Sequence, residues 1–390
     1  MLLMIRLFLI LSIFLHANSL KVASYNVQNL FDMRLDKTEY KKYIPNSRYW
    51  NSRILNIKLN HISDVICDLN ADIIALEEIE NKNALKLLQK RLKLVGCEYR
   101  YSGITNTPNS SIQVAILSKY KIDYKRDIKV LGERYILEIG LKVFGKNLII
   151  FANHWKSKFR GGEDSRRIKS AKTLRDRLDE LKDREYIILG DLNSRHNERA
   201  VDEVLNRDKD LYNLWLNIKS SKRWSVNYYG KREAIDYILV SKSMLDGRGI
   251  DYINGSFKVF RKRYLFTKKG YIDRWGNKKE RGYSDHLPIY AEFSLEPYKK
   301  PLKQKIKNLT IKELLKRDKI TNPIKLSNSL VVSKDKNGVI IEDIKSKDRI
   351  FIYKMVRELE EGKIYNLVID DIKLYRGEIE IIGVLRVEEI

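Results

Sequence analysis

Cysteine and histidine are scarce in this chain, and their scarcity limits the kinds of site it can hold. Among 390 residues there are 2 cysteines and 5 histidines, without an HExxH motif or a Cys/His cluster. A zinc site is therefore not expected. Cys67 and Cys97 could pair in an oxidising compartment, but the sequence does not show whether their Cα atoms come close enough. We expect two buried free thiols, with a disulfide as the alternative.

Long apolar runs are also lacking. The N-terminal run Leu7–Leu15 is too short to span a bilayer comfortably, and Arg6 precedes it. This pattern predicts a signal peptide over residues 1–17, with Ala17 at the cleavage point, and no cysteine stands there to mark a lipoprotein. We therefore expect a periplasmic or secreted protein with no stable membrane association after cleavage. An uncleaved membrane anchor is the alternative.

Positive charge, by contrast, is in excess. The formal net charge is +25 and the pI is about 9.7, which favours a polyanionic partner, either nucleic acid or an anionic membrane surface. The apolar fraction of 43% argues against disorder, and the length is sufficient for two domains. We predict a catalytic domain over residues 18–298, a basic linker with a short helix over 299–320 and a small β domain over 321–390.

Polar side chains that can do chemistry follow or interrupt apolar strands at several places. The segments are Ser24–Leu30, Asp72–Glu78, Asn153–Ser157, Ile187–Ser194, Ala234–Val240 and Ser284–Pro288. Phosphodiester hydrolysis needs an attacking water, neutralisation of phosphoryl charge and a proton for the leaving oxygen. Asn26 and Glu78 offer the oxygen ligands that Mg²⁺ prefers, and His154 and His286 suit proton transfer near neutral pH.

Taken in order, these segments closely resemble the endonuclease/exonuclease/phosphatase superfamily, which includes DNase I and the exonuclease III-type nucleases. The resemblance covers about residues 20–295, and the Asn-His-Trp-Lys-Ser form of residues 153–157 is that of the family's secreted bacterial nucleases. It implies an α/β fold of two packed mixed β-sheets flanked by helices. It also implies a hydrolase whose cofactor is Mg²⁺, or Mn²⁺ or Ca²⁺.

The resemblance implies metal ligands. Glu78 resembles the main ligand, with Asn26 and Asp285 nearby. Glu77 stands where many members carry Gln, which leaves the choice between the two glutamates open. Strand alternation places Glu77 and Glu78 on opposite faces, and we prefer Glu78, with Glu77 as the fallback.

The catalytic roles are implied in the same way. His286 resembles the residue that activates water, and Asp236 would brace a histidine. His154 resembles the second histidine, which contacts the phosphate and protonates the leaving group. Asp191 and Asn193 resemble the pair that orients the nucleophile and the phosphoryl oxygens.

Several basic residues are candidates for substrate binding. Lys156 could contact phosphate and Arg166 opens an amphipathic helix, although an exposed, solvated position is the plain alternative for both. Residues 256–281 carry ten Lys/Arg and two acids. Within this range, cations alternate with rings in the set Arg261, Lys262, Arg263, Tyr264, Phe266, Lys268, Lys269, Tyr271 and Trp275. This mixture predicts a nucleic-acid groove, with a solvated loop as the alternative.

Apolar periodicity predicts the secondary structure. Helices are expected at 51–69, 81–93, 165–182 and 198–206. Strands are expected at 20–27, 72–78, 112–118, 134–143, 147–153, 186–191, 234–240 and 288–295. His61 falls in the first helix and is expected to be a packing or surface residue, and His196 a solvated loop residue.

The C-terminal region has a different pattern. Thr310 and Glu313 form the capping pair of a short helix, and five strands are expected between residues 330 and 387. Their number and spacing resemble a β-barrel of the OB type. Phe351 and Tyr353 share one face of a strand and could stack on bases, with a role in the core as the alternative.

These features together predict a secreted, divalent-metal-dependent nuclease, with DNA as the expected substrate and a monomer as the expected state. One alternative is another phosphoesterase of the same fold, such as a sphingomyelinase or a phosphatase acting on a small substrate. The alternative from a different class is a catalytically inactive nucleic-acid-binding protein.

Overall fold

The computed structural model describes residues 19–158, 164–228, 230–300, 306–353 and 359–390. The expected signal peptide, residues 1–17, lies outside the described residues. The chain forms two compact units. The first comprises the residues up to Trp215 together with Trp224–Lys299, and the second comprises Leu216–Arg223 and Lys300–Ile390.

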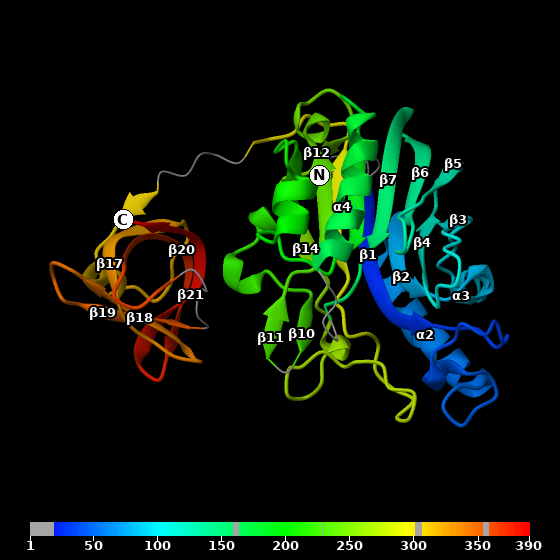
Figure 1. Ribbon diagram of the computed structural model, residues 1–390, viewed down its shortest axis with the longest axis horizontal. Helices are drawn as coiled ribbons and strands as arrows, with labels where there is room; N and C mark the ends of the chain where they lie inside the picture. Colours follow the sequence, from blue (N-terminus) through cyan, green and yellow to red (C-terminus); the bar gives the residue numbers. More distant parts are fainter. Residues whose placement is uncertain (1–18, 159–163, 229, 301–305, 354–358) are drawn as a thin grey trace, which may run out of the picture. The chain divides into compact units, whose positions relative to one another are not determined.

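Two mixed sheets form the first unit (Figure 1). The first sheet has the order β13-β15-β1-β2-β4-β3, with β14 also paired to β15. Its strands are β1 (Ser19–Leu30), β2 (Ile73–Ile79), β3 (Tyr101–Ile104), β4 (Gln113–Ser118), β13 (Asp251–Tyr252), β14 (Lys258–Val259) and β15 (Ile289–Ser294). The second has the order β5-β6-β7-β8-β12-β9. Its strands are β5 (Ile122–Ile128), β6 (Ile136–Val143), β7 (Lys146–His154), β8 (Tyr186–Asp191), β9 (Leu211–Asn213) and β12 (Asp236–Ser241).

The sheets pack face to face, because strands β1, β2 and β4 contact β7, β8 and β12. The central strands are buried almost throughout, as expected for sheets covered on both faces. A separate two-stranded hairpin joins β10 (Val226–Tyr228) to β11 (Lys231–Glu233). The fold class predicted from the sequence is confirmed.

Helices flank the sheets. The main ones are α2 (Ser52–Leu69), α3 (Lys82–Leu94) and α4 (Asp164–Asp179). The side chains of Asn51 and Asn81 cap α2 and α3 by accepting backbone N–H groups of the first turn. The shorter turns are η1 (Lys41–Tyr43), η2 (Ala200–Leu205), η3 (Leu214–Asn217), η4 (Ser220–Lys222), η5 (Lys242–Leu245) and η6 (Arg263–Leu265). None of the helices in the described ranges has the length and apolarity that a membrane crossing requires.

The expectation of two free thiols is wrong. Cys67 and Cys97 form a disulfide with a Cα–Cα distance of 5.6 Å. Cys67 lies near the end of α2, Cys97 follows α3, and the two helices pack on each other. That packing brings the cysteines within bonding range, and sequence periodicity does not reveal it.

The second unit is a closed five-stranded barrel in which β17 pairs with both β18 and β20 (Figure 1). Its strands are β17 (Ile324–Lys334), β18 (Gly338–Asp343), β19 (Arg349–Tyr353), β20 (Ile364–Tyr375) and β21 (Glu378–Glu389). A short strand β16 (Lys307–Asn308) pairs with β17, and helix α5 (Ile311–Leu314) carries the predicted capping box of Thr310. The ring order β17-β18-β19-β21-β20, with β19 and β21 parallel, is consistent with the predicted OB-like barrel.

On β19 the side chains alternate. Ile350 and Ile352 are buried in the barrel core, whereas Phe351 is half-buried and Tyr353 is 41% exposed. The two rings therefore lie on the outer face of the barrel, and the alternative of a core pair is wrong.

Candidate active site

The predicted catalytic residues come together at strand ends of both sheets. Asn26 lies on β1 and Glu78 on β2 of the first sheet, and His154 ends β7 and Asp191 ends β8 in the second. Strand register places Asp191 beside both His154 and Asp236. Asp285 and His286 lie in the loop before β15, which pairs with β1.

Close backbone packing fixes the position of Asp191. Gly190 has a φ of +125°, and a Cβ there would lie 2.0 Å from the carbonyl oxygen of Asn153 on the neighbouring strand. Only glycine fits this conformation and this distance. The Gly-Asp pair at the end of β8 therefore lets the two strand ends approach closely.

The predicted placement of Glu77 and Glu78 on opposite faces is wrong. Ser24 Oγ donates to Glu77 Oε1 at 3.1 Å, and Asn26 Nδ2 donates to Glu78 Oε1 at 3.1 Å. Ser24 and Asn26 share one face of β1, so both glutamates turn toward it. The cause is a bulge in β2, seen in its pairing with β4, where Glu78 has a φ of 68°. This irregularity interrupts the alternation on which the prediction depended.

His286 and Asp236 form a buried pair. His286 Nδ1 lies 2.9 Å from Asp236 Oδ1 and 3.0 Å from Oδ2, and Ser225 Oγ also donates to Asp236. Burial alone would lower the pKa of His286, but the charges of Asp236 and Asp191 raise it well above its ordinary value. The two carboxylates therefore favour the protonated form of His286.

Asp191 is the centre of the cluster. Its Oδ2 accepts from Asn26 Nδ2 at 3.3 Å and lies 3.7 Å from His154 Nε2 and 3.8 Å from His286 Nε2. Its Oδ1 accepts the backbone N–H of Asn193 at 2.9 Å. Burial raises the pKa of Asp191 to about 7; the charges of Asp236 and Glu78 act in the same direction, and His286 opposes them.

His154 has the opposite electrostatic environment. Burial lowers the pKa of His154 well below its ordinary value, and the charges of Arg134 and His286 add to this effect. The Nδ1 atom of His154 is buried and has no hydrogen-bond partner among the described residues. The surroundings of His154 therefore favour its neutral form, whereas those of His286 favour the protonated form.

The donor set fits a hard divalent cation. Burial raises the pKa of Glu78, and the charge of Asp285 raises it further. Burial also raises the pKa of Glu77, and the charges of Asp236 and Asp191 add to this effect. Such shifts show a local excess of carboxylates. Glu77 Oε2 is also buried without a hydrogen-bond partner among the described residues. An oxygen-rich, acid-rich site of this kind suits Mg²⁺ or a similar ion.

Two sets of residues could hold the ion. Asp191, Asp236 and His286 offer ligand atoms within 4.8 Å of one another, but Asp236 is already engaged by His286 and Ser225. Glu78 and Asp285 are less engaged: Asp285 is paired with Arg274 at 3.1 Å, and Glu78 accepts from Asn26. We favour the Glu78 set. Asn26 turns its Nδ2 toward the carboxylates, while its Oδ1 accepts from the backbone of Gln28, so an Asn26 ligand would require rotation of that amide.

The predicted substrate-binding residues separate into two groups. Lys156 and Arg166 both line a cavity close to the end of β7. Arg261 instead packs on Trp224, with its guanidinium 4.3 Å from the ring centroid and a hydrogen bond to the Trp224 carbonyl. Lys262 and Arg263 are exposed.

The aromatic part of the predicted groove is partly core. Trp275 is only 5% exposed, and its backbone exchanges two hydrogen bonds with the side chain of Gln28. It is therefore not available to stack on a base, whereas Tyr271 is 46% exposed. His61 stacks on Tyr283 in the helix-packing role expected for it, and His196 is exposed.

The sequence did not identify Arg134 or Lys58. Arg134 Nε donates to the carbonyl of His154 at 2.8 Å, and the fully buried Lys58 donates to the carbonyls of Val27 and Tyr283 at 2.6 and 2.9 Å. Burial lowers the pKa of Lys58 to about 7. Lys58 thus joins strand β1, next to Asn26, to the loop before Asp285. The one feature of the sequence that could have indicated a buried Lys58 is its position among the apolar residues of α2.

Comparisons with known proteins find solved structures of a similar fold. The crystal structure of humanized D. rerio TDP2 with 14 mutations is 15% identical, with a TM-score of 0.50, over 71% of this chain and 99% of that one. D. rerio TDP2 complexed with a single-strand DNA product is 16% identical, with a TM-score of 0.50 and coverages of 71% and 99%. A family protein from Leptotrichia buccalis C-1013-b is 16% identical, with a TM-score of 0.48 and coverages of 70% and 99%. No curated protein sequence matches the chain.

The structural likenesses show the fold, and the sequence itself shows the family. Residues 21–295 match the Endonuclease/Exonuclease/phosphatase family, whose members are usually metal-dependent phosphoesterases or nucleases. This match spans the whole set of strand ends that carry the site. The chain therefore belongs to the endonuclease/exonuclease/phosphatase family.

Proposed function

We propose that this protein is an exported, divalent-metal-dependent nuclease that hydrolyses phosphodiester bonds in DNA. The observation that carries the proposal is the convergence on Asp191. Asn26 donates to its Oδ2 at 3.3 Å, and the Nε2 atoms of His154 and His286 lie within 3.8 Å of the same oxygen. Both sheets contribute to this cluster, which brings two histidines, a carboxylate and an amide together.

The residues of the site supply proton transfer and positioning. Asp236 contacts Nδ1 of His286 and favours its protonated form, in which Nε2–H can donate to the leaving oxygen. His154 is neutral and can accept a proton from the attacking water. These directions favour the reverse of the roles expected from the family resemblance. Asn193, whose Nδ2 donates to the carbonyl of Trp155 at 3.2 Å, is fixed beside Asp191.

A divalent ion at Glu78 and Asp285 would neutralise charge on the phosphoryl oxygens. Mg²⁺ is the proposed ion, with Mn²⁺ and Ca²⁺ as candidates for the same oxygen ligands. Arg134 and Lys58 do not replace it, because both donate to backbone carbonyls. The carboxylates of the site therefore need an added cation when a phosphate is bound.

Substrate class and location rest on different observations. The net charge of +25 supports a polyanionic substrate, whose binding should be strongly salt-dependent. The Cys67–Cys97 disulfide supports export to an oxidising compartment, as does the apolar N-terminal run. Export, DNA specificity and a monomeric state are parts of the proposal.

The proposal is tested by incubating the purified protein with circular DNA, linear DNA, RNA and sphingomyelin, each with and without EDTA. We expect cleavage of DNA that EDTA abolishes, and cleavage of the circle would establish endonuclease action. Cleavage of sphingomyelin without cleavage of nucleic acid would refute it in favour of another phosphoesterase. Tight DNA binding without turnover under any metal would favour an inactive binding protein.

A further inference from the structure

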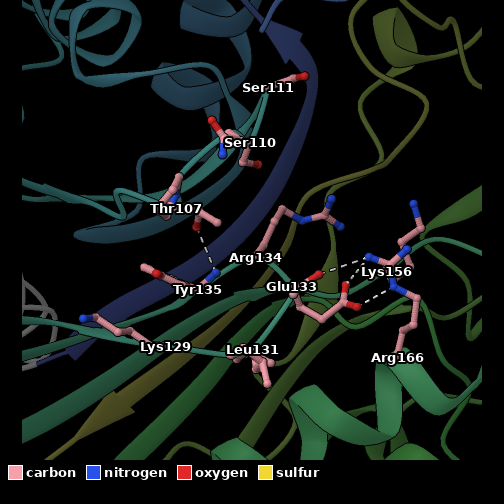
Figure 2. A pocket seen from close by; sticks show the side chains of 14 residues that line it. Thr107, Ser110, Ser111, Lys129, Leu131, Glu133, Arg134, Tyr135, Lys156 and Arg166 are labelled. Atoms are coloured by element: carbon pink, nitrogen blue, oxygen red, sulfur yellow. Dashed lines mark hydrogen bonds and ion pairs between the residues drawn. The ribbon is translucent and has the colours of Figure 1, made fainter.

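A cavity of about 630 Å³ lies beside the candidate active site. Its walls come from residues 107–111, from residues 129–135 and from two side chains that follow β7, Lys156 and Arg166. Figure 2 shows Lys156, Arg166 and Glu133 together on one side, with Ser110 and Ser111 at some distance from them. A cavity of this size suits a single small ligand and not a paired duplex.

The cavity carries positive charge that no acid among the described residues pairs with. Arg166 forms a bidentate ion pair with Glu133, which neutralises the charge of that carboxylate in the cavity wall. The ammonium group of Lys156 has neither a hydrogen bond nor an ion pair within the described part of the chain. Burial lowers the pKa of Lys156, and the nearby Arg166 and Arg134 lower it further. A half-buried cation among other cations is a favourable position for an anion.

The cavity is connected to the catalytic cluster through Arg134. This arginine lines the cavity and donates from Nε and Nη2 to the carbonyls of His154 and Trp155, at 2.8 and 2.6 Å. The charges of Glu78 and Asp191 act on Arg134, so its guanidinium lies within electrostatic range of both. Lys156 follows His154 by two residues, which corresponds to about 7 Å of extended backbone. This separation is within reach of a neighbouring nucleotide of a strand whose scissile phosphate is at His154.

We propose that this cavity holds the unpaired nucleotide next to the scissile phosphate, with Lys156 contacting its phosphate. The inference rests on the proposed nuclease function and adds a preference: single-stranded or locally opened DNA binds better than an intact duplex. Thr107 and Ser110 supply hydroxyl groups in the wall that can hydrogen-bond to a base or sugar. Lys156 is thus a binding residue, separate from the groups that transfer protons.

Binding is measured without turnover, on the full chain in EDTA, by fluorescence anisotropy with a labelled short single-stranded oligonucleotide. Lys156→Ala should weaken binding about tenfold or more, as expected for a lost charged hydrogen bond. It should also reduce the salt slope by about 0.7, the value for one phosphate contact on a single strand. Lys156→Arg should retain most of the affinity, which a purely structural role for the side chain would not predict.

The matched control is Lys146→Ala. Lys146 is exposed at the first residue of β7, about 26 Å along the strand from His154. Lys146→Ala removes the same charge at the far end of β7 and should change the affinity by less than about twofold. Equal loss in the two lysine variants would overturn the assignment of the cavity. Equal affinity for a fully paired hairpin, with the same dependence on Lys156, would overturn the preference for an unpaired nucleotide.

A second measurement separates the cavity from the chemistry. Bis(p-nitrophenyl) phosphate is a small diester that can occupy only the scissile position. Lys156→Ala should lower kcat/KM for the oligonucleotide about tenfold, and the loss for the small diester should be much smaller. A similar loss for both substrates would place Lys156 on the scissile phosphate and refute the subsite. If the wild-type protein cleaves neither substrate, the proposed function fails, while the anisotropy measurement still decides the cavity.

Discussion

Asp236→Asn would remove the charge that keeps His286 protonated while preserving the shape of the side chain. Asp236 is 2% exposed, and its two oxygens lie 2.9 and 3.0 Å from His286 Nδ1. In the variant, His286 would be left with Asp191, at 3.8 Å, as its closest acid among the described residues. The pKa of His286 should therefore fall, and the proton available to the leaving oxygen should be lost near neutral pH.

The magnitude follows from the role. A positioned general acid contributes about 10²- to 10⁴-fold to turnover, so kcat should fall within this range. The raised pKa also affects stability. The contribution of the pair is complete below about pH 6.5, the ordinary pKa of histidine, and it is lost as the pH rises through the higher folded pKa. The stability difference between wild type and Asp236→Asn should therefore be largest in acid and shrink in alkali.

Three measurements check this reasoning. Initial rates on DNA between pH 5 and pH 9 give kcat, urea titrations in EDTA give the free energy of unfolding, and NMR titration of the imidazole gives the pKa of His286 directly. Asp202→Asn is the matched control, because Asp202 forms an exposed pair with Lys209. Wild-type turnover in Asp236→Asn, or an unchanged His286 titration, would refute the role of the pair.

Three other changes test separate parts of the structure. Glu78→Gln should weaken Mg²⁺ binding, measured by calorimetry, at least about tenfold, because the ion loses a charged oxygen ligand. An unchanged affinity would favour the Asp191 cluster as the ion site. Gly190→Ala should lower the free energy of unfolding, measured by urea titration, by at least about 1–3 kcal/mol. The reason is that residue 190 has a left-handed conformation in which a Cβ would meet the Asn153 carbonyl. An unchanged free energy of unfolding would show that β7 and β8 can separate freely. The double change Cys67→Ser and Cys97→Ser should cost about 2–4 kcal/mol, as expected for a crosslink with a sequence separation of 30, and equal unfolding midpoints with and without the bond would contradict this.

Much of the fold could be predicted because most strands and helices carry regular apolar patterns. Strands β8 and β12 are buried throughout, β2 is buried except at Glu78, and all three contain apolar runs. Strand β5 was not predicted, because it lies at a sheet edge and most of its side chains are polar and exposed. Hydrophobic periodicity does not detect a strand that is held mainly by backbone pairing.

The site was predictable as a set of residues but not as an arrangement. Asn26, His154, Asp191 and Asp236 do meet, because parallel and antiparallel neighbours end at the same edge. Strand alternation, however, places Glu78 on the face of β2 opposite to Glu77. It cannot predict the φ of 68° at Glu78 that turns this side chain to the other face. Arg134 was missed for a related reason: it precedes β6, far in sequence from every motif, and only the pairing of β6 with β7 brings it under His154.

The charge states of the two histidines show where sequence reasoning ends. Both were expected to titrate near neutral pH, and the family resemblance gave each a role. Their pKa values diverge because His286 faces Asp236 and Asp191, whereas His154 is buried next to Arg134. The proposed acid and base roles therefore depend on neighbours that lie far away in the sequence. Added positive charge near Asp285 would lower the pKa of the adjacent His286, since charge of the same sign opposes protonation. The metal and the proton of this site are consequently coupled, and a pH profile measured at several Mg²⁺ concentrations should shift to lower pH as the ion binds.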